Sequence, residues 1–271
     1  MLALIYLGPW LLTAGLLYAF GVFDDDDEET AEDEDTITGT DGDDTLVGSE
    51  ADDEVLAKAG DDEVWTLEGS DSVFADDGND TIIGGAGDDL SRGGHGDDYI
   101  YDVEGSDTIV AGAGNDTVYA AAMADGFDDS DVEAYLADDD ATFAELTTAL
   151  FAGETFSDDP DADEGDEIKL GRGDDAVVAG AGDTVTGGAG ADQIGVFLRG
   201  EDAGEVTVTD FDAVEDYLVV YGSAGTVTFT PGPDDAAEVR VDDAVVALLQ
   251  GVDAATLEAS SVVFATVGER P

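Results

Sequence analysis

Hydrophobic side chains recur every nine residues between residues 39 and 119, each inside a short segment that follows a polar, glycine-rich one. The unit reads x-x-x-Gly-x-Asp-x-aliphatic-x, and its positions are numbered place one to place nine. Place four is Gly except at Ala51, and place eight is Ile, Leu or Val except at Ser91. Places one to six favour a turn, because Gly accepts positive φ and Asx side chains bond to local backbone. The last three residues, such as 81–83, suit a short strand.

A fixed period of this length predicts a solenoid, in which each unit buries its apolar side chain only by stacking on its neighbours. In a three-residue strand the middle side chain faces opposite to the other two, so Ile82 points inward and places seven and nine point outward. Two units then make one winding of a flattened roll. The predicted fold class is all-β, a parallel β-roll (a right-handed solenoid of nonapeptide repeats) with a short helical insert and an antiparallel β C-terminal cap.

Aspartate occupies place six in all nine units. Because two units make one winding, turns eighteen residues apart lie over one another, about 4.8 Å apart. The first ladder contains Asp44, Asp62, Asp80, Asp98 and Asp116, and the second contains Asp53, Asp71, Asp89 and Asp107. Carboxylates at that spacing repel by about 1 kcal/mol at the dielectric constant of water and by roughly 3.5 kcal/mol at an effective value of 20. Each ladder therefore opposes folding unless cations bind to it.

The cation that suits such turns is Ca²⁺, with several ions bound per chain. It takes about six to eight oxygen ligands, which carboxylates and backbone carbonyls supply, whereas Mg²⁺ requires a stricter octahedron. Zinc and copper prefer His or Cys, and the chain has one His and no Cys. Turns of the first ladder all keep Gly-(Asp/Asn)-Asp, with their place-four glycines at Gly42, Gly60, Gly78, Gly96 and Gly114. The second ladder has Ala51, Ser70 and Ser106 in its turns, so the first ladder is predicted to hold the tighter sites.

Residues 84–89 (Gly-Gly-Ala-Gly-Asp-Asp) and 93–98 (Gly-Gly-His-Gly-Asp-Asp) resemble the nonapeptide of the RTX, or hemolysin-type, calcium-binding repeat family. The resemblance covers about 115 residues of repeat and, more loosely, residues 208–218. It implies a calcium-binding β-roll whose carboxyl terminus often directs type I export, with folding triggered by calcium outside the cell. A hydrophobic amino terminus departs from that export route.

Three further segments follow the first array, which spans residues 36–119. Residues 120–161 form an insert, in which a capping box at 142–145 and the apolar Leu146 and Leu150 predict a short helix. Residues 162–198 form a second array whose copies alternate between eight and nine residues, so one good calcium site is expected, at Asp175 and Asp192. Alternating segments in 199–271, such as 205–209 and 217–221, predict the antiparallel cap.

The amino terminus and the charge indicate where such a chain works. Residues 1–23 carry no charged side chain and would span roughly 33 Å as a helix, which predicts a membrane anchor or a cleaved signal, and 24–35 form an acidic linker. Sixty-nine acidic against seven basic residues, a net charge of −62, exclude nucleic acid and anionic membrane surfaces as direct partners. Weak calcium sites fill outside the cytosol, so the chain is expected to be secreted, or anchored and facing outward.

No enzyme signature accompanies the repeats. The chain has no His-Glu-x-x-His, Gly-x-Ser-x-Gly or phosphate-loop motif, and His95 stands in a variable turn position. The first interpretation is a non-enzymatic, extracytoplasmic calcium-binding protein with a surface, adhesion or structural role, folded by its metal. The alternative is a polysaccharide-binding or polysaccharide-modifying module that uses an outer face of place-nine side chains, namely Val47, Trp65, Ile83, Tyr101 and Tyr119.

Overall fold

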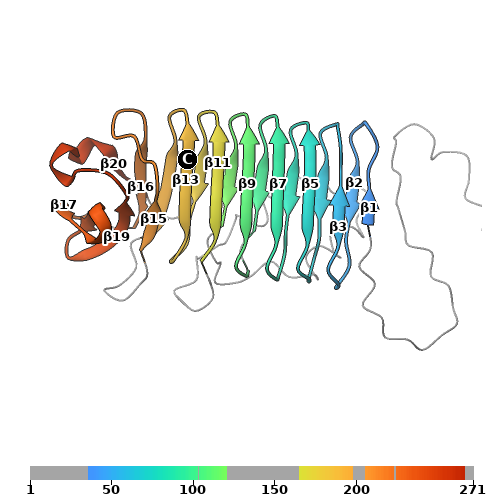
Figure 1. Ribbon diagram of the computed structural model, residues 1–271, viewed down its shortest axis with the longest axis horizontal. Coiled ribbons are helices and arrows are strands. Elements are labelled where there is room, and N and C mark those ends of the chain that lie inside the picture. Colours follow the sequence, from blue (N-terminus) through green and yellow to red (C-terminus); the bar gives the residue numbers. More distant parts are fainter. Residues whose placement is uncertain (1–35, 103, 121–164, 198–204, 223, 266–271) are drawn as a thin grey trace, which may run out of the picture.

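The chain folds into two facing β-sheets that form a long roll, as shown by a computed structural model that describes residues 36–102, 104–120, 165–197, 205–222 and 224–265 (Figure 1). The larger sheet contains, in spatial order, β1 (Thr36–Thr38), β3 (Glu54–Leu56), β5 (Ser72–Asp77), β7 (Leu90–His95), β9 (Thr108–Ala113), β11 (Glu167–Arg172), β13 (Thr184–Ala189), β15 (Val206–Val208), β19 (Ala244–Leu249), β18 (Ala237–Val241) and β17 (Val227–Pro231). The smaller sheet contains β2 (Thr45–Val47), β4 (Glu63–Trp65), β6 (Thr81–Ile83), β8 (Tyr99–Tyr101), β10 (Thr117–Tyr119), β12 (Ala176–Val178), β14 (Gln193–Phe197), β16 (Tyr217–Tyr221) and β20 (Val262–Ala265). Three short 3₁₀ helices, Pro233–Asp235, Ala254–Thr256 and Ala259–Ser261, lie in the cap.

Place eight forms the core between the sheets, as the period predicted. In the smaller sheet Val64 of β4 lies beside Ile82 of β6, eighteen residues later, and the two strands run parallel. Val64, Ile82 and Ile100 are completely buried. Each side chain that leaves water in this way contributes about 1.5–3 kcal/mol, so the roll is stabilised by repetition of one apolar contact. The predicted parallel β-roll is confirmed.

Strands of the larger sheet are longer than the three residues expected from the repeat. From β5 to β13 they span six residues, because backbone pairing continues into the first half of the next turn. Asp76 thus pairs with Gly94 and Asp77 with His95. Glycine and aspartate are poor strand formers by propensity, and here the stacking of identical turns overrides that preference.

The two arrays form one continuous roll. Strand β11 pairs directly with β9, with Ile168 opposite Ile109, and β12 pairs with β10, with Val177 opposite Val118. Figure 1 shows this junction where the green strands meet the yellow ones. The two windings are separated in sequence by the insert, and its predicted helix lies outside the described residues.

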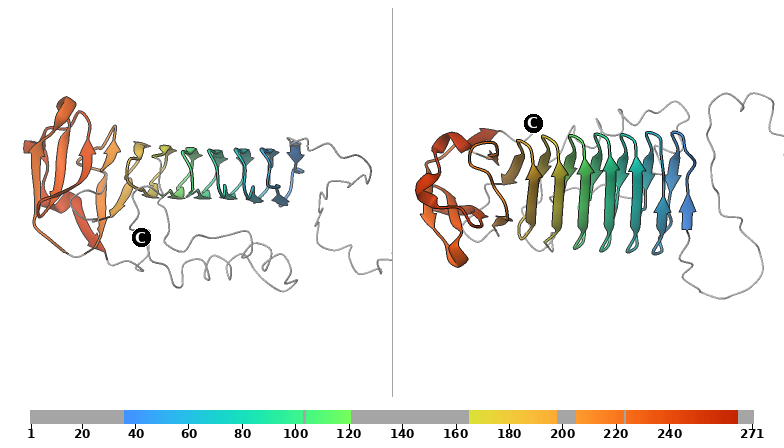
Figure 2. Two further views of the ribbon diagram at one scale, coloured as in Figure 1. Left: turned by 90° about the horizontal axis from the view of Figure 1, so that it is seen from below. Right: turned by 45° about the horizontal axis from the view of Figure 1, so that its top comes forward.

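The antiparallel cap is smaller than predicted. Among the described residues only β17, β18 and β19 pair antiparallel. Strand β15 pairs in parallel with β13 and β19, and β16 with β14 and β20, so the segments expected at 205–209 and 217–221 add a further winding to the roll. Two-residue alternation indicates a strand with one buried face but not its direction, which explains the error. The cap closes the end of the roll on the left of Figure 2.

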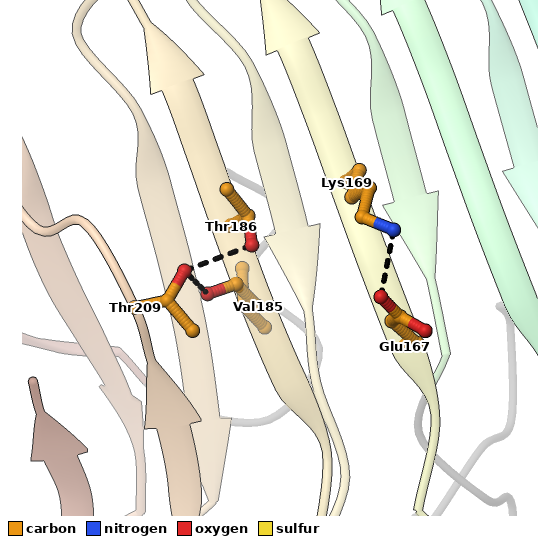
Figure 3. A network of polar contacts seen from close by, with 5 residues as sticks. All are labelled: Glu167, Lys169, Val185, Thr186 and Thr209. Atoms are coloured by element: carbon orange, nitrogen blue, oxygen red, sulfur yellow. Dashed lines mark hydrogen bonds and ion pairs between the residues drawn. The ribbon is translucent and has the colours of Figure 1, made fainter.

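Side-chain contacts join the last windings across the larger sheet (Figure 3). The hydroxyls of Thr186 and Thr209 lie 2.8 Å apart, and Thr209 Oγ1 also donates to the carbonyl of Val185 at 3.3 Å. One winding earlier, Lys169 Nζ contacts Glu167 Oε1 at 2.6 Å on the solvent face of β11. Exposed ion pairs contribute little, so of these contacts the threonine ones contribute more to joining the last windings of the roll.

Candidate metal centre

Buried aspartates line both edges of the roll, where the turns stack. In each ladder the backbone N–H of a place-six aspartate donates to Oδ1 of its counterpart in the next turn, at 2.7–3.1 Å. The first ladder runs through Asp44, Asp62, Asp80, Asp98, Asp116, Asp175, Asp192 and Asp216, and the second through Asp53, Asp71, Asp89, Asp107, Asp166 and Asp183. All are at most 8% exposed. The structure thus brings together every aspartate predicted from the sequence.

Asp166, Asp183 and Asp216 were not predicted as site residues. Asp166 and Asp183 follow a glycine in the shortened turns of the second array, and that Gly-Asp pair was the signal for them. Asp216 belongs to no repeat, but its Oδ1 accepts the N–H of Asp192 at 3.0 Å and so extends the first ladder into the last turn. Only the three-dimensional stacking identifies it.

The other carboxylate oxygen of the ladder aspartates, Oδ2, is the one available to bind a metal ion. Within the described residues, the buried Oδ2 atom has no hydrogen-bond partner at Asp62, Asp71, Asp80, Asp89, Asp98, Asp116 and Asp175. A buried polar atom without a partner costs about 1–3 kcal/mol, and native proteins rarely leave one unless an ion or water binds there. A row of such atoms along both edges fits a hard cation with oxygen ligands, which is the chemistry of Ca²⁺.

Turns at the ends of the ladders are closed differently. Asp44 Oδ2 accepts from the Thr40 hydroxyl at 2.8 Å, and Asp53 Oδ2 accepts from the backbone N–H of Ser49 at 2.7 Å. Asp183 Oδ2 accepts from Gly180 at 2.7 Å, three residues back instead of the usual four, which reflects the turn shortened by one residue. These oxygens are occupied by the protein itself, so the free carboxylate oxygens gather in the middle of the roll.

Burial dominates the electrostatics of the ladders. It raises the pKa of the carboxyl group to about 6 at Asp62, Asp71, Asp80, Asp116, Asp175 and Asp192, and to about 7 at Asp89 and Asp98. The donated backbone N–H opposes this rise in pKa, and neighbouring carboxylates add to it. Without a counter-ion the charged form is therefore less favourable in the folded chain than in water.

Three of the five place-nine side chains do not form the exposed platform expected from the sequence, whereas Val47 and Tyr119 are half-buried. Trp65 is 1% exposed, Ile83 3% and Tyr101 2%. They face away from the core between the sheets, as alternation requires, yet they are shielded from water. Alternation determines which face a side chain occupies, not what covers that face, so the inference from direction to exposure was wrong.

Comparison with models of known protein families identifies the repeats that form the ladders. The model of the RTX calcium-binding nonapeptide repeat matches residues 30–64, 57–91, 65–100, 92–122, 163–184 and 171–194. Over these residues the chain carries RTX calcium-binding nonapeptide repeats. RTX nonapeptide repeats bind Ca²⁺, and the unpaired Oδ2 atoms of both ladders fit that ion.

Other comparisons are distant. No curated protein matches this chain. Among solved structures it is similar to the extracellular lipase LipA from Serratia marcescens, with 16% sequence identity and a TM-score of 0.27. The match covers 88% of this chain and 41% of the lipase, so the chain spans less than half the length of that protein.

Proposed function

We propose that this chain is a non-enzymatic, extracytoplasmic RTX protein whose folding is coupled to Ca²⁺ binding and whose role is in a surface coat, in adhesion or in structure. The observation that carries the proposal is the row of buried carboxylate oxygens without partners along the ladders. Ions that bind the folded turns and not the unfolded chain stabilise the fold by mass action. The proposed ligands are the place-six aspartates with the carbonyls of their turns, including those next to the place-four glycines.

Separate observations support the proposed extracytoplasmic location and the proposed lack of catalytic activity. Turn sites of this kind are expected to fill at extracellular calcium, about 10⁻⁴–10⁻³ M, and residues 1–23 provide a hydrophobic signal or anchor, although they lie outside the described part of the chain. Within the described residues no helix is long and apolar enough to span a bilayer. The sequence carries none of the enzyme motifs sought above, and the ladders stack their carboxylates turn upon turn, as a metal-binding scaffold requires.

We expect the Asp80→Asn variant to lose more calcium affinity than Asp71→Asn. Both carboxylates have an unpaired Oδ2 atom. Beside Asp71, however, the Thr66 hydroxyl donates to the carbonyl of Gly84 at 2.5 Å, which is one of the turn carbonyls proposed above as ligands. Isothermal titration calorimetry with Ca²⁺, and with Mg²⁺ as the competing ion, measures the difference, expected to be about tenfold. Equal losses in the two variants would refute the ranking of the ladders.

A groove on the smaller sheet favours polysaccharide binding as a second candidate function. It has a volume of about 400 Å³ and is lined by Tyr99, Thr117, Tyr119, Asp174, Asp175, Ala176, Ala191, Gln193 and Tyr217. Tyrosine rings beside a carboxylate of the first ladder suit a sugar that stacks and also contacts calcium. The rings of Tyr99 and Tyr119 lie 5.5 Å apart.

The groove is tested with a glycan array in Ca²⁺. Tyr217→Ala is expected to abolish binding, because it removes one wall of the groove. Val214→Ser, a change at a side chain that is 91% exposed in the last turn of the roll, serves as the control and is expected to bind as the unmodified chain does. An array on which the unmodified chain binds no glycan would eliminate this candidate.

A further inference from the structure

Two irregular residues form a polar pair inside the apolar roll. Ser91 is the one place-eight residue of the first array that is not aliphatic, and Asp102 is the one charged residue at place one, where the other repeats have Gly, Ala or Thr. Both are 0% exposed, and the Ser91 hydroxyl donates to Asp102 Oδ2 at 3.0 Å. They stand eleven residues apart, in repeats that lie one winding apart, and the hydrogen bond joins them, so the two departures from the pattern are parts of one feature.

Asp102 lies between two turns of the second ladder. A Cβ atom at Gly84 would lie 2.3 Å from Asp102 Oδ1, so the carboxylate fills the space that the missing side chain of Gly84 leaves. Gly84 begins the turn of Asp89, and Asp102 begins the turn of Asp107. Carboxylate oxygens of Asp89, Asp102 and Asp107 all lie within 4.8 Å of one another, and all three residues are buried. No other turn of the array has a third carboxylate at place one.

The described residues offer no counter-charge to Asp89 or Asp102. Asp102 Oδ1 and Asp89 Oδ2 have no hydrogen-bond partner, and no ion pair among the described residues involves either carboxylate. Burial, followed by the charges of Asp107 and Asp89, raises the pKa of Asp102 well above its ordinary value, and the Ser91 hydroxyl acts in the opposite direction. A fully buried carboxylate with an unpaired oxygen directed into a group of carboxylates indicates a bound cation.

We propose that Asp89, Asp102 and Asp107 form a three-carboxylate Ca²⁺ site that binds more tightly than any turn site made from place-six aspartates alone. Calcium affinity rises with the number of charged ligands and the rigidity of the site, and this site has one carboxylate more than the others. Ser91 is a positioning residue, since it holds Asp102 Oδ2 and leaves Oδ1 for the ion. The inference rests on the proposed function, namely calcium binding by the turns.

The test compares Asp102→Asn with Asp88→Asn in the full chain, by calorimetric Ca²⁺ titration and by Tb³⁺ luminescence. Asparagine keeps the shape of Asp102 and its bond from Ser91 but removes the charge. Asp88 is exposed at place five of the turn of Asp89, so its variant loses the same charge from the same turn but outside the three buried carboxylates. Asp102→Asn is expected to weaken the tightest site about tenfold or more and to leave the weaker sites intact, while Asp88→Asn leaves all sites unchanged.

A second variant keeps the proposal testable if Asp102→Asn does not fold. The double replacement Ser91→Val with Asp102→Gly restores the residue types of the regular repeat, so it is expected to lose the same site and yet to be more resistant to heat without metal. If both variants bind calcium as the unmodified chain does, Asp102 only fills space and the three-carboxylate site is wrong, although the proposed function stands. If the unmodified chain binds no calcium at all, the proposed function itself fails.

Discussion

Gly78→Ala is expected to destabilise the calcium-loaded roll by about 3 kcal/mol or more, whereas Gly42→Ala is expected to change it by less than about 1 kcal/mol. Gly78 has φ +152, and a Cβ atom there would lie 1.8 Å from the carbonyl oxygen of Gly60 in the preceding turn. The backbone of Gly60 cannot move away from this Cβ atom without breaking the hydrogen bonds between the stacked turns. Gly42 stands in the first turn of the same edge, where the nearest atom to a Cβ would be Thr40 Oγ1 at 4.0 Å.

Chemical denaturation in saturating Ca²⁺ measures the difference between the two variants. The same reasoning explains Ala51, the one place-four residue of the first array that is not glycine. It lies in the first turn of the second ladder, and the close contact falls on the following turn, where a Cβ atom at Gly69 would lie 2.9 Å from the Ala51 carbonyl. If Gly42→Ala proves as damaging as Gly78→Ala, stacking of turns does not account for the glycine at place four.

Metal-free protein is expected to be more stable at pH 5 than at pH 7.5, and calcium is expected to reverse that order. Ladder carboxyls have pKa values of about 6 to 7 in the fold, against an ordinary 3.8. Between these values the folded chain holds more protons than the unfolded one, so the free energy of unfolding falls as pH rises through this window. Each carboxylate contributes on the order of 1 kcal/mol, and at least eight are affected.

The comparison is made by thermal melts followed by circular dichroism, with EDTA or with Ca²⁺, in 0.5 M KCl. High salt screens repulsion among exposed charges but acts much less on buried ones, which separates the ladders from the overall charge of −62. Calcium binds the charged form and competes with protons, so its stabilising effect grows with pH. A metal-free chain whose β signal and melting temperature both rise from pH 5 to pH 7.5 would show that the ladders do not govern stability.

Periodicity alone predicted most of the roll, because a repeat of nine fixes the turn, the buried side chain and the spacing of the aspartates together. Ile82 and Asp80 are examples, since the structure places one in the core and the other in the ladder. Strand direction in residues 206–221 was not predictable in this way. Parallel and antiparallel strands share the same alternation, and the distinction arises when β15 and β16 pair with the preceding winding.

Two features of the site could not be predicted from the sequence either. Asp107 bonds to Asp166, fifty-nine residues later, and no local pattern indicates that the roll resumes in register after the insert. Asp102 could have been noticed as the one charged residue at place one, but its meaning depends on Gly84 in the adjacent winding, which makes space for it. Chemistry that depends on contacts between windings requires the structure.

Coupling of folding to calcium is tested most directly by far-UV circular dichroism of the metal-stripped chain at pH 7.5 during titration with Ca²⁺, with Mg²⁺ in parallel. The ladders leave buried carboxylates unpaired without an ion, so we expect a change from coil to β structure at about 10⁻⁴–10⁻³ M Ca²⁺ and none with Mg²⁺ at the same concentrations. A chain that already shows its full β signal in EDTA, with no change on adding calcium, would contradict the account.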